Sequence, residues 1–245
     1  DVVDAGEGTE RVGRRFATVL PMAGETTTTP ITCPHCRKTF RPRLLAGPRL
    51  EQHFMCGIVG YVGQRSASPL LVECLRRLEY RGYDSSGVAL MLRGQIEITR
   101  AEGKLASLCA KLEQRTDCET GEARVGIGHT RWATHGRPTE TNAHPHRSQD
   151  GKIVVVHNGI FENFLELRSA LEASGCRLES DTDTECFPAL VSQLMRQGLG
   201  FEAAFRGAIG EIHGIYAIAC LHQDDPDRVF VARSGPPLVV GVGAG

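Results

Sequence analysis

The chain has 245 residues, a formal net charge of -1 and 41% hydrophobic residues, enough for one sizeable core or two small ones. The balanced charge gives no electrostatic reason to expect a nucleic acid or membrane partner, and no apolar run approaches the roughly 20 residues of a membrane span. No signal peptide is recognisable, and the odd number of nine cysteines indicates reduced thiols in a cytoplasmic protein, not a disulfide framework.

Residues 1–54 differ in character from the rest of the chain. They combine a glycine-, glutamate- and arginine-rich opening, a threonine run and a basic segment, with weak apolar periodicity. We therefore predict a disordered leader, or an artefact of a start site assigned upstream of the natural one. Cys33 and Cys36 have the spacing of half a zinc knuckle, but four tetrahedral ligands are not evident, so zinc binding there stays open.

Regular patterns begin at Cys56. Residues 58–62 are typical of a short buried strand, and the apolar positions of residues 70–78 fall on one face of a helix. After a glycine-punctuated loop, residues 88–92 and 96–99 predict a hairpin that turns at Arg93-Gly94.

The second half of the chain predicts further strands and helices. Strands are expected at 125–130, 153–156, 215–221, 229–232 and 238–242, and helices at 162–173, after 182–185 and at 202–209. The order of strands, helices and strands again indicates stacked α and β layers and not a βαβ nucleotide-binding fold.

Cys56 directly follows Met55, so removal of the methionine would leave a thiol and a free α-amino group on one residue. An α-amino group has a pKa of about 7.7–8.0 and can accept the thiol proton near neutrality. The residue would then be a self-contained nucleophile and base. The alternative is a buried structural cysteine that opens an apolar strand.

Two predicted strand ends carry further candidates. Arg131 could clamp a small-molecule carboxylate or form a structural salt bridge, and Trp132 could belong to a site or to the core. Asn158 and Gly159 follow a run of three valines. A side-chain amide and a glycine N–H at a strand exit can form an oxyanion hole, although Asn-Gly is also an ordinary turn.

Asp183 lies in the segment Thr182–Glu185, which has the spacing of a helix-capping box. Its carboxylate could cap helix N–H groups or hold a substrate ammonium group. His135, His144 and His146 lie in a proline-containing loop without metal-ligand spacing, so we expect no metal there.

Taken together, the motifs resemble a known family. The segments occur in the order found in the glutaminase half of isomerizing glutamine–fructose-6-phosphate aminotransferases: 55–60, 76–85, 129–136, 142–146, 157–159 and 182–185. The resemblance covers residues 55–245. It implies an α+β fold of four layers, α/β/β/α, the N-terminal-nucleophile hydrolase fold, with two stacked, mainly antiparallel sheets between helices.

The resemblance also implies a chemistry for these residues. Cys56 would attack the side-chain amide of L-glutamine, releasing ammonia and leaving a glutamyl thioester that water hydrolyses. Asn158 and Gly159 would form the oxyanion hole, Arg131 would bind the α-carboxylate and Asp183 the α-amino group. The remaining substrate contacts would come from Trp132, Thr134, His135 and His144. No cofactor and no metal are implied.

The sequence departs from the family pattern at both ends. If the leader is retained, the nitrogen of Cys56 is part of a peptide bond and cannot act as the base. We favour a true start at Met55 over cleavage of the leader or an inactive chain. The glutaminase domain is expected to be incomplete after Gly245, which leaves a sheet edge unpaired and lowers stability. We expect the isomerase half to be absent. Fructose 6-phosphate would then be a partner only through that half, in a parent enzyme expected to be homo-oligomeric.

Two alternatives remain. The chain could be another class II glutamine amidotransferase, of the amidophosphoribosyltransferase, asparagine synthetase or glutamate synthase type, although segments 80–84 and 129–132 favour the aminotransferase. It could also be a non-catalytic glutamine-sensing module in which the leader masks Cys56.

Overall fold

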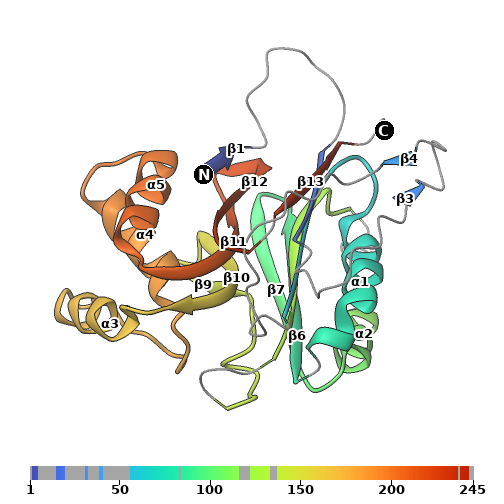
Figure 1. The fold of residues 1–245 in the computed structure, drawn as a ribbon, viewed down its shortest axis with the longest axis horizontal. Coiled ribbons are helices and arrows are strands. Elements are labelled where there is room, and N and C mark those ends of the chain that lie inside the picture. Colours follow the sequence, from blue (N-terminus) through green and yellow to red (C-terminus); the bar gives the residue numbers. More distant parts are fainter. Residues whose placement is uncertain are drawn as a thin grey trace.

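The computed structural model describes residues 2–4, 15–19, 31–32, 39–40, 56–82, 84–115, 122–132, 137–236 and 238–242. In this part of the chain two antiparallel sheets lie face to face, with helices on the outer face of each (Figure 1). The order helices, sheet, sheet, helices agrees with the α+β layers that the sequence predicts.

The first sheet has the strand order β1-β12-β11-β10-β9. Its strands are β1 (Val2–Asp4), β9 (His146–Arg147), β10 (Ile153–Phe161), β11 (Gly214–His222) and β12 (Asp225–Ser234). Its outer face packs against α4 (Cys186–Arg196) and α5 (Phe201–Glu211), and α3 (Phe164–Ala173) lies beside α4. The core of this layer is aromatic, and Phe187, Phe205 and Phe230 are fully buried in it.

The second sheet has the strand order β13-β2-β5-β8-β6-β7. Its strands are β2 (Arg15–Val19), β5 (Gly57–Val62), β6 (Ser85–Leu92), β7 (Gln95–Glu102), β8 (Val125–Arg131) and β13 (Val239–Val242). Its outer face carries α1 (Ala67–Leu78), followed by the 3-10 turn η1 (Glu79–Arg81), and α2 (Leu105–Gln114).

Within residues 1–54 the structure describes only β1, β2 and a separate ribbon of β3 (Ile31–Thr32) and β4 (Thr39–Phe40). β1 pairs with β12, and β2 pairs with β5 and β13. Cys33 and Cys36 lie outside the described residues. A leader distinct from the glutaminase domain stays a prediction.

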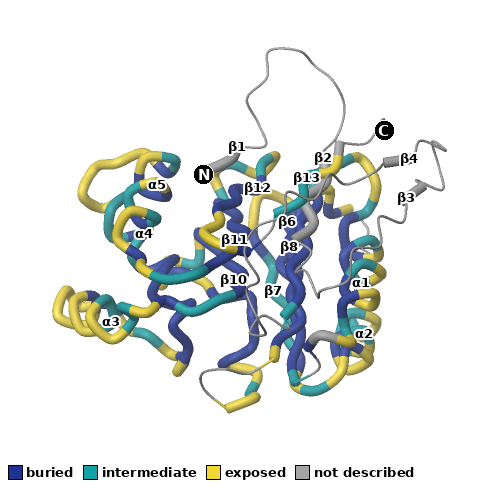
Figure 2. The backbone as a smooth tube through the Cα atoms, viewed as in Figure 1, coloured by how far each residue is buried: buried dark blue, intermediate teal, exposed yellow. Residues whose placement is uncertain are grey.

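The side chains of each strand alternate between two cores, as the pleat of a strand requires. Val154 and Val156 of β10 point into the apolar layer between the sheets, whereas Ile153 and Val155 point toward α4 and α5. Ile58 of β5 and Ile127 of β8 enter the same inter-sheet layer. Figure 2 shows the resulting burial of the sheets beneath helices that are exposed on their outer sides.

The inter-sheet face continues into polar residues at one end. Counting on by twos from Ile58, Ile127 and Val156 leads to Cys56, His129 and Asn158. The same alternation that builds the core therefore directs these three side chains toward a common region.

Most predicted elements are confirmed, and two details differ. The hairpin turns at Arg93 and Gly94 as predicted, with φ of 49° and 78°, as a tight hairpin turn demands. The placement of Asn158 and Gly159 at a strand exit or turn is wrong, because β10 continues to Phe161 and pairs these residues with Ala217 and Tyr216. Helix α2 was not predicted, because its apolar face is short.

Among the described residues, no helix combines the length and the apolar character needed to cross a bilayer.

Candidate active site

Cys56 lies where three segments meet. It directly precedes β5, and the backbone N–H of Trp132, just after β8, donates to its Sγ at 3.1 Å. The thiol lies 3.5 Å from the carbonyl oxygen of Trp132. From the other sheet, Asn158 Nδ2 donates to the carbonyl oxygen of Cys56 at 3.0 Å. The cysteine is partly exposed, so its sulfur is not sealed in the core.

Asn158 and Gly159 are brought to this point by β10. The side chain of Asn158 is buried, and its two polar atoms have different partners: Nδ2 contacts Cys56, and Oδ1 lies 2.8 Å from Nε2 of His129. Gly159 has φ of 128°, a conformation that residues with a side chain rarely adopt. The strand is thus locally distorted at the position expected to supply an N–H donor.

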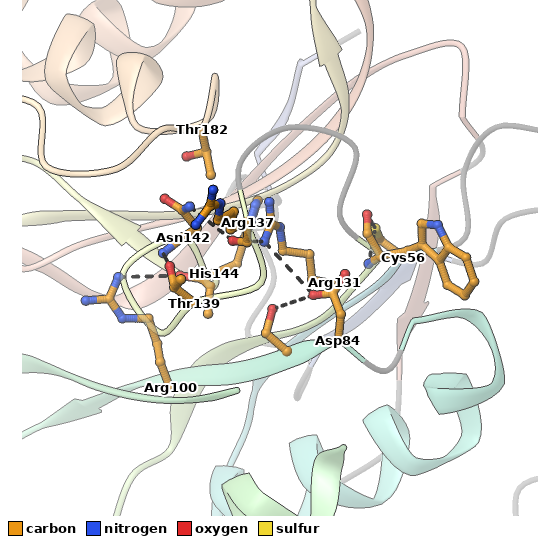
Figure 3. Close-up of polar contacts among 12 residues, drawn as sticks. Cys56, Asp84, Arg100, Arg131, Arg137, Thr139, Asn142, His144 and Thr182 are labelled. Atoms are coloured by element: carbon orange, nitrogen blue, oxygen red, sulfur yellow. Dashed lines mark hydrogen bonds and ion pairs between the residues drawn. The ribbon is translucent and has the colours of Figure 1, made fainter. Parts of the chain in front are cut away.

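Arg131 ends β8 as predicted, and its side chain is buried, with 4% of the residue exposed. Its Nη1 lies 4.0 Å from Oδ1 of Asp84 and donates to the carbonyl oxygen of Arg137 at 3.4 Å (Figure 3). Asp84 is itself fixed, because Ser85 Oγ donates to its Oδ1 at 2.9 Å. The structure therefore holds a buried guanidinium group with a planar set of donors beside the Cys56 region.

Asp183 is also buried, and it does not cap α4. Its Oδ2 accepts the backbone N–H of Phe161, the last residue of β10, at 2.9 Å. The cap position of α4 is Glu185, which makes no side-chain capping bond there. The carboxylate of Glu185 instead accepts the N–H of Ser180. The capping interpretation is wrong because the segment before α4 is folded against β10 and the loop near Ser180.

Of the other four predicted site residues, the structure describes Trp132 and His144. Thr134 and His135 lie outside the described residues. Trp132 is 38% exposed, so the alternative that it belongs to the core is wrong. His144 is buried, and its Nδ1 accepts the backbone N–H of His157 at 3.2 Å.

Four buried histidines surround the inner side of the site: His129, His144, His146 and His157. Burial lowers the pKa of His129 to about 3 and that of His157 to about 4, although Asp183 raises the latter. Burial also holds the pKa values of His144 and His146 well below the ordinary range. The rings are therefore neutral near pH 7, and their role is hydrogen bonding and packing, not charge. In the described part of the chain no group of His, Cys, Asp and Glu is arranged to hold a metal.

Sequence reasoning did not select Asp84 or His129. Both lie in the segments that carried the family resemblance, but a lone aspartate before a strand and a histidine within one are common. What distinguishes them is contact with Arg131 and Asn158 across 47 and 29 positions of sequence, which no local pattern encodes.

Known proteins share this architecture. Residues 129–242 match a family described as the glutamine amidotransferase domain. The chain is 50% identical over 191 residues to the isomerizing glutamine–fructose-6-phosphate aminotransferase of Pyrococcus horikoshii, covering 78% of this chain and 31% of that protein. It is 49% identical over 191 residues to the enzyme of the same name from Rhizobium meliloti, covering 78% of this chain and 30% of that protein. The chain thus spans less than a third of the length of these relatives.

A solved structure shares the fold at lower identity. The glutamine phosphoribosylpyrophosphate amidotransferase from B. subtilis, complexed with ADP and GMP, superposes with a TM-score of 0.55 at 23% identity, over 68% of this chain and 35% of that chain. The predicted N-terminal-nucleophile hydrolase fold is confirmed. Residues 129–242 therefore carry a glutamine amidotransferase domain.

Proposed function

We propose that this domain hydrolyses the side-chain amide of L-glutamine, with Cys56 as the nucleophile. The observation that carries the proposal is the 3.0 Å contact between Asn158 Nδ2 and the carbonyl oxygen of Cys56. It brings a buried amide donor from one sheet to the residue that opens a strand of the other. A carboxamide is a poor electrophile, so a donor near the nucleophile is what its hydrolysis requires.

The reaction would run in two steps. The α-amino group of Cys56 takes the thiol proton, and the thiolate attacks the amide carbon of glutamine. The C–N bond then breaks, the proton passes to the leaving nitrogen, and ammonia departs from a glutamyl thioester. Water, deprotonated by the same amine, adds to the thioester and releases glutamate and the thiol. Asn158 Nδ2 and the N–H of Gly159 stabilise both oxyanions.

Glutamine carries a carboxylate and an ammonium group, and the site offers one partner for each. Arg131 would bind the carboxylate through its guanidinium fork, and Asp183 the ammonium group. Trp132, Thr134, His135 and His144 would complete the substrate contacts. The reaction needs neither a cofactor nor a metal.

The names of the relatives extend the proposal to the whole protein. Ammonia from glutamine would be used to convert fructose 6-phosphate to glucosamine 6-phosphate, through an isomerase half of the whole protein. The identity of 50% and 49% to these relatives, against 23% to the phosphoribosylpyrophosphate amidotransferase, favours this acceptor over those of other class II amidotransferases. We further propose that the enzyme is homo-oligomeric and cytoplasmic. Five of the described cysteines are free thiols, which supports a reducing compartment: Cys74, Cys109, Cys176, Cys186 and Cys220.

The mechanism requires an unblocked amine on Cys56. Either residues before Cys56 are removed, or translation starts at Met55 and the methionine is cleaved. N-terminal sequencing of the natural protein tests this directly. A retained leader together with glutamine binding and no ammonia release would instead support the glutamine-sensing module.

The decisive assay is glutamine-dependent release of ammonia by the protein produced from Met55. Cys56→Ala is expected to abolish release while glutamine binding is kept. Cys74→Ala is the matched control, because Cys74 is a partly buried thiol on α1 whose pKa is raised by burial, away from the site. Equal ammonia release from Cys56→Ala and the unmodified protein would refute the nucleophile assignment.

A further inference from the structure

His129 and Asn158 come from different sheets and meet in the layer between them. His129 lies on β8 and Asn158 on β10, and Nε2 of the histidine is 2.8 Å from Oδ1 of the asparagine. Both residues are buried: His129 is 1% exposed and Asn158 is 3% exposed. We infer that His129 is a positioning residue that holds the Asn158 amide with its N–H donor directed toward the nucleophile. The inference rests on the proposed hydrolysis.

The direction of the hydrogen bond follows from the partner on the other side of Asn158. The carbonyl oxygen of Cys56 can only accept, so the atom that contacts it at 3.0 Å must be the amide nitrogen. Oδ1 then faces His129, and Nε2 of the ring must carry the proton. Nδ1 of His129 is buried without a hydrogen-bond partner among the described residues, which suits a bare nitrogen better than an N–H.

The ring that donates this bond is itself fixed. It stacks on the ring of His144, with centroids 4.1 Å apart and planes 15° apart. His144 is held in turn, because its Nδ1 accepts the backbone N–H of His157. Burial lowers the pKa of His129 to about 3, so the ring stays neutral and its single N–H does not change with pH near neutrality. The donor position is therefore set by the packed interior.

An asparagine amide needs such a partner because its terminal torsion is soft and roughly two-fold. A half-turn would exchange Oδ1 and Nδ2 and present an acceptor to the developing oxyanion. The N–H of His129 favours the orientation with Oδ1 toward the ring. In the flipped amide, the NH2 group would face that N–H, and two donors cannot form a hydrogen bond with each other. Accepting this bond also polarises the amide and strengthens its donor end.

The inference predicts a defect in the chemical step and not in glutamine binding. Removal of one oxyanion-hole donor costs about 10²–10³ in kcat, so loss of its positioning residue should cost about 10–100-fold. His129→Leu should show this loss with KM changed less than about twofold, and His129→Gln, which can offer an N–H at the same place, should recover most of it. His146→Leu is the matched control, because His146 is equally buried and bonds Thr182 instead.

A double-mutant cycle in the full protein with Cys56 at its N-terminus separates positioning from structural damage. In the Asn158→Ala background, His129→Leu should lower kcat less than about threefold, because the amide that it positions is gone. Equal factors in both backgrounds, or unchanged kcat in His129→Leu, would overturn the inference while the proposed hydrolysis stands.

A measurement independent of activity is 15N NMR of the unmodified protein. The His129 ring, assigned by comparison with His129→Gln, is expected to carry its proton on Nε2. A proton on Nδ1 would overturn the inference whether or not ammonia is released. If the unmodified protein carries the proton on Nε2 but has no glutaminase activity, the result would instead count against the proposed function.

Discussion

A Cβ atom built on Gly159 would lie 2.0 Å from the carbonyl oxygen of Ile215 on the adjacent strand β11. Real Cβ atoms do not approach a backbone oxygen so closely, and the φ of 128° is unfavourable for any side chain. Two independent constraints therefore reserve this position for glycine, at the residue expected to donate the second oxyanion-hole N–H.

Gly159→Ala is expected to lower the free energy of unfolding by about 1–3 kcal/mol, because the strand must shift to relieve strain and contact together. It should also lower kcat for glutamine hydrolysis, since the shift moves the N–H. Gly210→Ala on α5 is the control, because nothing lies within 4 Å of its added Cβ. That change should be neutral or stabilising by up to about 1 kcal/mol. Urea unfolding of both variants compares them, and equal stabilities would contradict the strain argument.

The layers and most of the candidate residues could be predicted from the sequence because they depend on local pattern. Apolar alternation identifies strands, and the helical period of residues 70–78 identifies α1. The same alternation, extended past Val156, could have shown that β10 continues. His157 and Asn158 are polar, so the apolar alternation stops at Val156. The pairing of β10 with β11 nevertheless continues as the strand passes from the apolar layer into the site.

The partners of the site residues could not be predicted. The contact of Asp183 with Phe161 and that of Arg131 with Asp84 join segments that only the stacked sheets bring together. The sequence suggested that Asp183 caps a helix, because Thr182–Glu185 has the spacing of a capping box. The carboxylate instead accepts a strand N–H, a long-range outcome that tertiary folding decides.

Arg131→Lys tests the proposed carboxylate clamp. An ammonium group cannot reproduce the paired, coplanar donors of guanidinium, so KM for glutamine should rise about 10–100-fold with a smaller change in kcat. Steady-state ammonia release measures both constants. Arg206→Lys is the control, since Arg206 is an exposed arginine on α5 that contacts Glu202. An unchanged KM in Arg131→Lys would remove Arg131 from the clamp.

Asp183→Asn tests the proposed ammonium partner. The amide oxygen can still accept the N–H of Phe161, so the fold should be kept while the negative charge is lost. KM for glutamine should rise about 10–100-fold, as for the loss of a charged hydrogen bond. Asp181→Asn is the control, because Asp181 is an exposed carboxylate that contacts Asn142.

A des-amino analogue of glutamine sharpens the Asp183 test. The unmodified protein should discriminate against it, whereas Asp183→Asn should treat glutamine and the analogue nearly alike. Discrimination that survives the substitution would show that the ammonium group binds elsewhere.

The buried histidines predict a loss of stability in mild acid. In the folded protein the pKa of His129 is about 3 and that of His157 about 4, whereas both return to about 6.5 in the unfolded chain. Between these values the unfolded chain binds more protons, so the free energy of unfolding falls as pH falls from 6.5 toward 4. Each histidine contributes about 1.4 kcal/mol per pH unit once the pH is well below 6.5.

Urea unfolding at pH 7.5, 6 and 5 measures this slope. His129→Gln should reduce the pH slope by the contribution of one histidine, because glutamine does not titrate. This expectation holds even if the variant is less stable than the unmodified protein at pH 7.5. The slope of the unmodified protein, measured under the same conditions, is the reference. An unchanged slope in His129→Gln would mean that His129 is already charged in the folded protein near pH 6. A charged ring could donate from both nitrogens, and the buried Nδ1–H would then need an acceptor that the described residues do not supply.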